Sequence, residues 1–265
     1  MTHTERDLRR RRTERRRRRT RARAAGGAVA AVALGVLALT LFARSGGRVA
    51  HTSTATRRVP VAAPSNGVAA TRRSHAHSAS ARLARAVARE ARRPQTHDLP
   101  STHGALFGAL MRSLWRGVVS GRARPALVAF FPKAAYVRLK AIYGAASDWQ
   151  SRLVRDYALD LAAAHRLLGT DAAHARLVGV RARSAYGHWI PPGVCSNDIG
   201  YYEMPDARVI YRERGATRSF GIASMISWRG EWYVVHLGAI LRTGEGGVLD
   251  TPAIGPGAQV PSSTC

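Results

Sequence analysis

From residue 101 onward, the apolar residues first recur at helical spacing. Between Leu106 and Val118 they occupy positions 106, 107, 110, 111, 114, 115 and 118, which form one stripe of an amphipathic helix. Ser101 or Thr102 stands where an N-cap belongs, and Gly121 follows the last apolar position. The pattern therefore predicts both ends of this helix as well as its buried face.

Three more helices are predicted before the pattern changes. Two of them begin at a proline, which suits the first turn of a helix because the N–H groups there need no partner within the helix. The third carries a long apolar stripe and is followed by Gly169. They are a short helix from Pro125, a helix from Pro132 to Gly144, and a longer helix from Ser147 or Asp148 to Leu168.

After these helices the apolar residues alternate with polar ones, as they do in strands. Strands are predicted over 175–186 and 207–214. A hairpin is predicted over 218–241, with Arg229-Gly230 as its two-residue turn.

Helices followed by antiparallel strands indicate an α+β domain whose curved sheet packs its apolar face over the helices. This domain is expected over residues 101–242, a length that is ample for one hydrophobic core. The glycine- and proline-rich residues 243–265 are expected to lie along its surface as a tail.

The first 43 residues have the pattern of a membrane anchor. Residues 1–23 hold twelve arginines against three carboxylates, a net charge of +9, and residues 24–43 are twenty residues without a charge. A helix of that length crosses a hydrocarbon core of ~30 Å, and arginines beside a span hold that end in the cytoplasm. We therefore expect a single-pass signal anchor in the cell membrane, with the N-terminus cytoplasmic and the C-terminal domain extracytoplasmic. A cleaved signal peptide is the alternative.

Residues 44–100 are dominated by Ser, Thr, Ala, Pro, Gly and Arg, which predicts a low-complexity tether because there is little apolar surface to bury. Residues 78–93 have a helical pattern, but Leu83 and Val87 are their only sizeable apolar side chains. A basic surface helix is expected there rather than an element of the core.

The formal net charge of +26 bears on the partners of the chain. Residues 44–265 carry +17 of it, and such a surface attracts anionic envelope polymers or lipid headgroups. A solvated basic surface without a specific partner is the alternative, and a protein partner in the envelope is left open. No aromatic residues interleave the arginines of the tether, so nucleic acid is not expected as a partner.

Polar residues fall on the inward faces of the long helix and of the last hairpin, where they would line any cavity between these two elements. Asp160 falls inside the apolar stripe of this helix, where an unpaired carboxylate would cost several kcal/mol. Alternation along the last strand puts His236 on one face with Trp232, opposite Ala223. The candidate lining residues are Trp149, Tyr157, Asp160, Met225, Trp232 and His236.

Asp160 and His236 would supply general acid–base chemistry if they met across this space. The structural alternative is a hydrogen-bonded core histidine and a carboxylate that accepts hydrogen bonds from backbone donors or from an arginine such as Arg138 or Arg208. Other catalytic motifs are missing from the sequence, which holds neither GxSxG nor SxxK. The histidines of the tether are scattered without acidic neighbours, so no metal and no cofactor is expected.

Cys195 and Cys265 are the only cysteines, and both fall on the side assigned to the oxidising compartment. We expect them to form a disulfide that fixes the tail to the domain. The alternative is a small buried thiol at position 195 and a free or intermolecular one at position 265.

The order of the elements and the hairpin SWRGEWYVVH resemble the NTF2-like cone fold. The arm, anchor and tether, together with the stretch WIPPGVCSNDIGYY, resemble membrane-anchored proteins of actinobacterial envelopes that carry such a domain. The resemblance covers roughly residues 101–242 and implies a cavity between helices and sheet, but no particular activity, because this fold hosts enzymes and binding modules alike. We expect a domain that binds or scaffolds a ligand or partner. The alternative is a small-molecule enzyme that uses Asp160 and His236.

Overall fold

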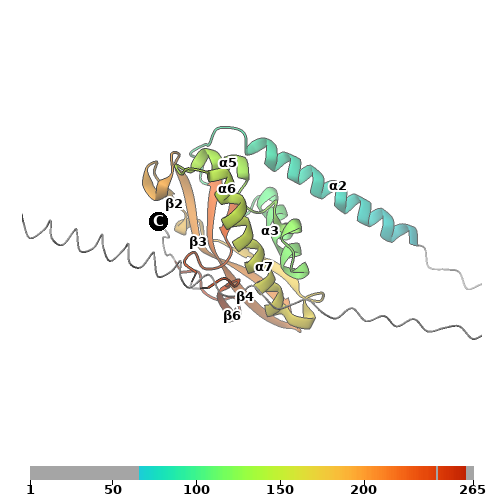
Figure 1. Cartoon of the computed structure of the whole chain (residues 1–265). Helices are drawn as coiled ribbons and strands as arrows, with labels where there is room; N and C mark the ends of the chain where they lie inside the picture. The colour runs from blue at the N-terminus through green and yellow to red at the C-terminus, as the bar shows by residue number, and fades with distance from the viewer. Residues whose placement is uncertain (1–65, 243, 261–265) are drawn as a thin grey trace, which may run out of the picture. The chain divides into compact units, whose positions relative to one another are not determined.

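The computed structural model describes residues 66–242 and 244–260, with side chains from Ser78 onward. These residues belong to one compact unit and form an α+β domain in which helices are followed by a curved antiparallel sheet, as predicted (Figure 1). The predicted arm, anchor and first part of the tether lie outside the described residues. Within the described ranges, no helix is long and apolar enough to cross a membrane.

The α-helices precede all strands of the sheet. A π-helical turn, Trp149–Leu153, joins the last two of them into one continuous helix. The α-helices are α2 (Asn66–Glu90), α3 (Ala105–Ser120), α4 (Ala123–Ala126), α5 (Lys133–Leu139), α6 (Ala145–Asp148) and α7 (Val154–Leu168).

The sheet has the strand order β1-β3-β4-β5, with β2 paired to β3 and β6 paired to β4. All of these pairs are antiparallel. The strands are β1 (Arg176–Arg181), β2 (His188–Ile190), β3 (Tyr201–Glu213), β4 (Ala216–Trp228), β5 (Glu231–His236) and β6 (Asp250–Ile254).

The turn predicted for the β4–β5 hairpin is confirmed. Arg229 and Gly230 are its two central residues, with φ values of 51° and 72°. A two-residue turn with positive φ at both positions matches the right-handed twist of the strands it joins, which is why this hairpin could be identified from its sequence.

The apolar stripe of α3 is buried as predicted, and this helix contacts β1, β5 and α7. Gly121 follows α3 in the left-handed conformation, with φ of 64°. The expected N-cap is wrong, because the helix begins after Gly104 and no side chain caps it. Ser101 Oγ instead accepts a hydrogen bond from the N–H of His103, which makes a local turn before the helix.

The folded part starts before Ser101. Helix α2 lies within the segment expected to be a tether, and its Val87 and the following Ala91 are buried in the core. Trp228 donates its indole N–H to the carbonyl of Glu90, and Arg229 forms an ion pair with the Glu90 carboxylate. Contacts with the distant hairpin therefore order this helix, whose own apolar content is too low to do so.

The glycine- and proline-rich tail also belongs to the fold. Its residues Asp250–Ile254 form β6 along β4, where a surface segment was expected. Further on, the buried Gln259 donates a hydrogen bond to the Pro205 carbonyl and accepts one from the N–H of Arg183. The tail is thus held by backbone pairing and a buried amide, neither of which requires an apolar pattern.

Candidate functional site

A pocket of about 230 Å³ lies between α5, the π-helical turn and strands β3, β4 and β5. This volume suits a ligand of a few heavy atoms, because pockets for drug-sized ligands occupy ~300–1,000 Å³. Apolar side chains such as Ile226 and Ile240 form part of the wall. The polar residues that line it are Tyr136, Lys140, Arg152, Glu203, Ser224 and His236.

A β-bulge in β5 directs His236 into this pocket. Met225 is paired with Val234, but the preceding Ser224 is paired with His236, so Val235 is the extra residue. The extra residue reverses which face the following side chain occupies. The prediction that His236 lies opposite Ala223 on the face of Trp232 is therefore wrong.

Four side chains form a polar row across the sheet on the pocket side. Glu203 is buried and accepts a hydrogen bond from Ser224 Oγ at 3.0 Å. Ser224 lies directly opposite His236, and on the other side His188 lies directly opposite Glu203, with Nε2 3.3 Å from the carboxylate Oε2. Directly opposed residues point to one face, so the row runs from the half-exposed His188 to the pocket.

Cationic side chains line the helical side of the pocket. Arg152 is paired with Asp148 through contacts of 2.6 and 2.7 Å, and Tyr136 donates its hydroxyl to the same carboxylate at 2.6 Å. The Lys140 ammonium instead donates to the neutral Cys195 carbonyl at 2.9 Å. The charge of Arg152 is thus compensated within the protein, whereas the partner of Lys140 carries no charge.

Departures from regular α-helix bring both cations, Arg152 and Lys140, to the pocket. Arg152 lies in the π-helical turn, which was not expected from the sequence, and π-turns inside α-helices occur frequently at functional sites. Helix α5 ends at Leu139, before the predicted Gly144, because Lys140 pairs with Asn197 in an isolated β-bridge. This bridge brings the loop that carries Cys195 against the pocket.

That loop holds two non-glycine residues in the left-handed region. Cys195 has φ of 53° and Ser196 has φ of 55°. Such conformations cost roughly 1–3 kcal/mol each and persist where the surroundings impose them, often at ligand sites. Here the surroundings include the hydrogen bond from Lys140 and the bridge to Asn197.

The imidazole of His236 is neutral at ordinary pH. Burial, and to a smaller extent the nearby cations Arg152, Arg242 and Lys140, together lower its pKa to about 4. None of the described residues forms a hydrogen bond with this imidazole. A neutral imidazole has one donor and one acceptor nitrogen, so His236 offers both to a molecule in the pocket.

The low pKa of His236 makes stability depend on pH. Between about pH 4 and pH 6.5 the unfolded chain binds a proton at this position and the folded chain does not, so His236 favours unfolding as the pH falls through this window. We expect His236→Gln to lose less stability than the wild type between pH 7 and pH 4.5, measured by urea unfolding. Identical losses in the two proteins would show that His236 has an ordinary pKa.

Asp160 has a structural environment. It is buried, and it accepts hydrogen bonds from the N–H groups of Gly238 and Val248 and from both terminal nitrogens of Arg242. The prediction that it points inward and accepts hydrogen bonds from backbone donors or from an arginine is confirmed. Both kinds of donor are present, and the arginine is Arg242, not Arg138 or Arg208. Its backbone donors follow His236 in the chain, and among the described residues no hydrogen bond links the side chains of Asp160 and His236.

The other candidate residues fill the core and do not line the polar pocket. Tyr157 is buried and donates its hydroxyl to the Ala126 carbonyl, and the partly buried Trp149 donates to the Phe131 carbonyl. Trp232 is buried and donates its indole N–H to the Pro100 carbonyl, and Met225 is also fully buried. Of the six candidates, His236 alone lines the pocket.

The sequence interpretation did not identify Lys140, Arg152, Glu203 or Ser224. A signal for Glu203 was present, because it lies two residues after Tyr201 and therefore shares the buried face of β3 with it. It was not used because the predicted strand began only at residue 207. No comparable signal marks Lys140, whose position depends on an isolated bridge. The described residues contain no group of three metal-ligating side chains, and Cys265 lies outside them.

In comparisons with known proteins, no family model, no curated protein and no solved structure matches this chain.

Proposed function

We propose that this chain is a single-pass cell-envelope protein whose extracytoplasmic domain binds a small hydroxy acid in the pocket beside His236. The membrane attachment rests on the charge and apolar pattern of residues 1–43. The helices, the curved sheet and the pocket between them also support an NTF2-like cone fold. The observation that carries the binding proposal is a neutral imidazole that faces a cavity without a hydrogen-bond partner among the described residues.

The chemistry of the ligand follows from the walls. Lys140, whose ammonium is bonded to a neutral carbonyl, gives one side of the pocket a positive potential, which favours a carboxylate there. The opposite side presents the acceptors of Glu203, Ser224 and the His236 imidazole, which favours a hydroxyl donor. A volume of about 230 Å³ limits the molecule to a few heavy atoms, and a small 2-hydroxy acid such as glycolate carries both groups within that size.

An acid–base enzyme built on Asp160 and His236 is the weaker proposal. Four hydrogen bonds occupy both oxygens of Asp160, so this carboxylate has no free position from which to orient an imidazole. The polar groups of the pocket can bind a ligand through hydrogen bonds and charge, and binding does not require any of them to transfer a proton.

Titration calorimetry on the full chain in neutral detergent tests the proposal, with glycolate as the ligand. We expect Lys140→Met to weaken binding by about 10- to 100-fold, because a hydrogen bond to a charged group is worth ~1.5–3 kcal/mol. Lys133→Met is the matched control, since Lys133 is the only other lysine, lies at the opposite end of α5 and is exposed. It should bind like the wild type.

Selectivity gives a second readout. Acetate has the carboxylate but no hydroxyl, so the wild type should prefer glycolate, and His236→Leu should lose that preference. Absence of binding heat with glycolate in the wild type, or equal weakening by Lys140→Met and Lys133→Met, would refute the proposed pocket.

A further inference from the structure

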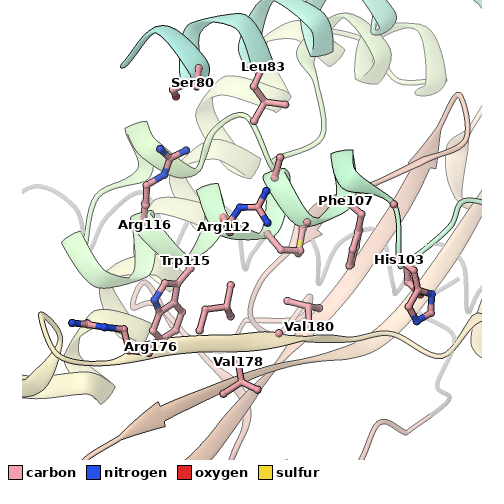
Figure 2. A pocket seen from close by; sticks show the side chains of 18 residues that line it. Ser80, Leu83, His103, Phe107, Arg112, Trp115, Arg116, Arg176, Val178 and Val180 are labelled. Atoms are coloured by element: carbon pink, nitrogen blue, oxygen red, sulfur yellow. The ribbon is translucent and has the colours of Figure 1, made fainter. Parts of the chain in front are cut away.

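A second, larger cavity of about 900 Å³ lies on another face of the domain, along α3. Residues of α2, α3 and β1 line it, together with the segment that leads into α3. In Figure 2, Ser80 and Leu83 of α2 point toward α3, and Trp115 lies between α3 and β1. We call this cavity the α3 groove. None of its lining residues lines the pocket beside His236.

The floor of the α3 groove is apolar. Phe107, Met111 and Trp115 lie one helical turn apart along α3 and contribute to the core, with exposed fractions of 4, 3 and 9 %. Leu83 from α2 and Val180 from β1 are partly buried and face them. Apolar side chains from three elements thus form a continuous surface along the cavity.

Arginines border this floor. Arg112 and Arg116 of α3 and Arg176 of β1 line the groove and are exposed to solvent, and no aspartate or glutamate lines it. Arg116 donates to Ser113 Oγ and Arg176 donates to the Ala173 and Ala175 carbonyls, all neutral groups. None of these three arginines forms an ion pair with a described carboxylate, so their charges are uncompensated.

We propose that the α3 groove binds an anionic membrane lipid, with an acyl chain on the floor of Phe107, Met111 and Trp115 and the headgroup phosphate at Arg112, Arg116 and Arg176. Guanidinium groups bind phosphate through paired hydrogen bonds. An apolar floor beside such cations suits an amphiphile better than an acidic peptide, whose polar backbone would meet the apolar wall without partners. The proposal rests on the membrane attachment proposed above, since α2 begins 22 residues after Arg44 at the end of the predicted span.

The test uses Trp115 as a reporter. The full chain in neutral detergent micelles is titrated with phosphatidylglycerol or phosphatidylcholine that carries brominated acyl chains, which quench the fluorescence of a tryptophan in contact with them. We expect quenching by phosphatidylglycerol at concentrations where phosphatidylcholine has no effect, and a loss of this quenching in Trp115→Phe. Equal quenching by the two lipids would overturn the proposal.

Matched arginine variants test the charges. The triple variant Arg112→Gln, Arg116→Gln, Arg176→Gln should weaken the response to phosphatidylglycerol by about 100-fold, since each cation near an anionic lipid surface contributes ~1 kcal/mol. The triple variant Arg122→Gln, Arg124→Gln, Arg166→Gln removes the same charge from exposed positions that do not line the groove. Equal weakening in the two would show nonspecific attraction and overturn the proposal.

Two measurements distinguish a lipid site from a peptide site and from the pocket beside His236. Glycolate binding should be unchanged in the groove variants, so failure of one site is distinguishable from failure of the other. A polyglutamate peptide should not protect Trp115 from the brominated lipid. If the peptide bound in the groove and the lipid did not, the groove would be a peptide site and the lipid proposal would be wrong.

Discussion

Replacing Asp160 by alanine is expected to lower the free energy of unfolding by about 3–5 kcal/mol, because removal of one partner leaves the other charge of a buried ion pair uncompensated. The Asp160 side chain is 1 % exposed and that of Arg242 is 12 % exposed, with Nη2 2.6 Å from Oδ2. The substitution also removes the acceptor for the N–H groups of Gly238 and Val248. These bonds fix the segment that leads from β5 to β6, so the attachment of β6 should weaken as well.

Urea unfolding of the full chain at pH 7 measures the effect. Asp156→Ala is the control, since Asp156 lies on the same helix and its carboxylate is 3.5 Å from Nε of the same Arg242. At 20 % exposure, its pair with Arg242 is expected to contribute no more than about 1 kcal/mol. An Asp160→Ala protein as stable as Asp156→Ala would contradict the structural role assigned to Asp160.

The second large effect concerns the cysteines. We propose that Cys195 forms a disulfide with Cys265, and we expect Cys195→Ser to lower the free energy of unfolding by about 4 kcal/mol, the chain-entropy value for a loop of about seventy residues. The structure supports this pairing through Gln259, which is held at Met204 and Pro205 near the start of β3. Cys195 precedes that strand, and the six residues from Gln259 to Cys265 span up to ~20 Å.

Mass spectrometry of the non-reduced protein should find one peptide that joins the two cysteines. Cys265→Ser should cost as much stability as Cys195→Ser, and the double variant should cost no more than either, because all three remove the same bond. Two freely alkylated thiols in freshly isolated protein would contradict the disulfide and also the proposed extracytoplasmic placement of the domain.

Local patterns predicted the elements that depend on local interactions. The stripe of α3 and the Arg229-Gly230 turn are examples, because periodicity and turn chemistry determine them within a few residues. The full extent of helix α2, its burial against the core, and strand β6 were missed for the opposite reason. Contacts far along the chain order both elements, such as Glu90 with Arg229 and β6 with β4, and their own sequences have little apolar content.

The same distinction applies to the candidate site. The phase of the long helix sufficed to predict that Asp160 is buried and paired. The position of His236 depends on one extra residue in β5. The sequence VVH at residues 234–236 does not indicate a bulge there, so the face of His236 could not be predicted. Lys140 and Arg152 depend on an isolated bridge and a π-helical turn, so sequence periodicity could not bring them to the same pocket.

The most direct test of the proposed binding site is the response of isoleucine methyl groups to glycolate. In the full chain in detergent micelles, with 13C-labelled isoleucine methyls, Ile226 and Ile240 report on the pocket, whereas the exposed Ile254 of β6 does not line it. We predict that saturating glycolate shifts the methyl signals of Ile226 and Ile240, leaves Ile254 unchanged, and has no effect at the same concentration in Lys140→Met. Unshifted signals of Ile226 and Ile240 in the wild type would contradict the binding of a small hydroxy acid at His236.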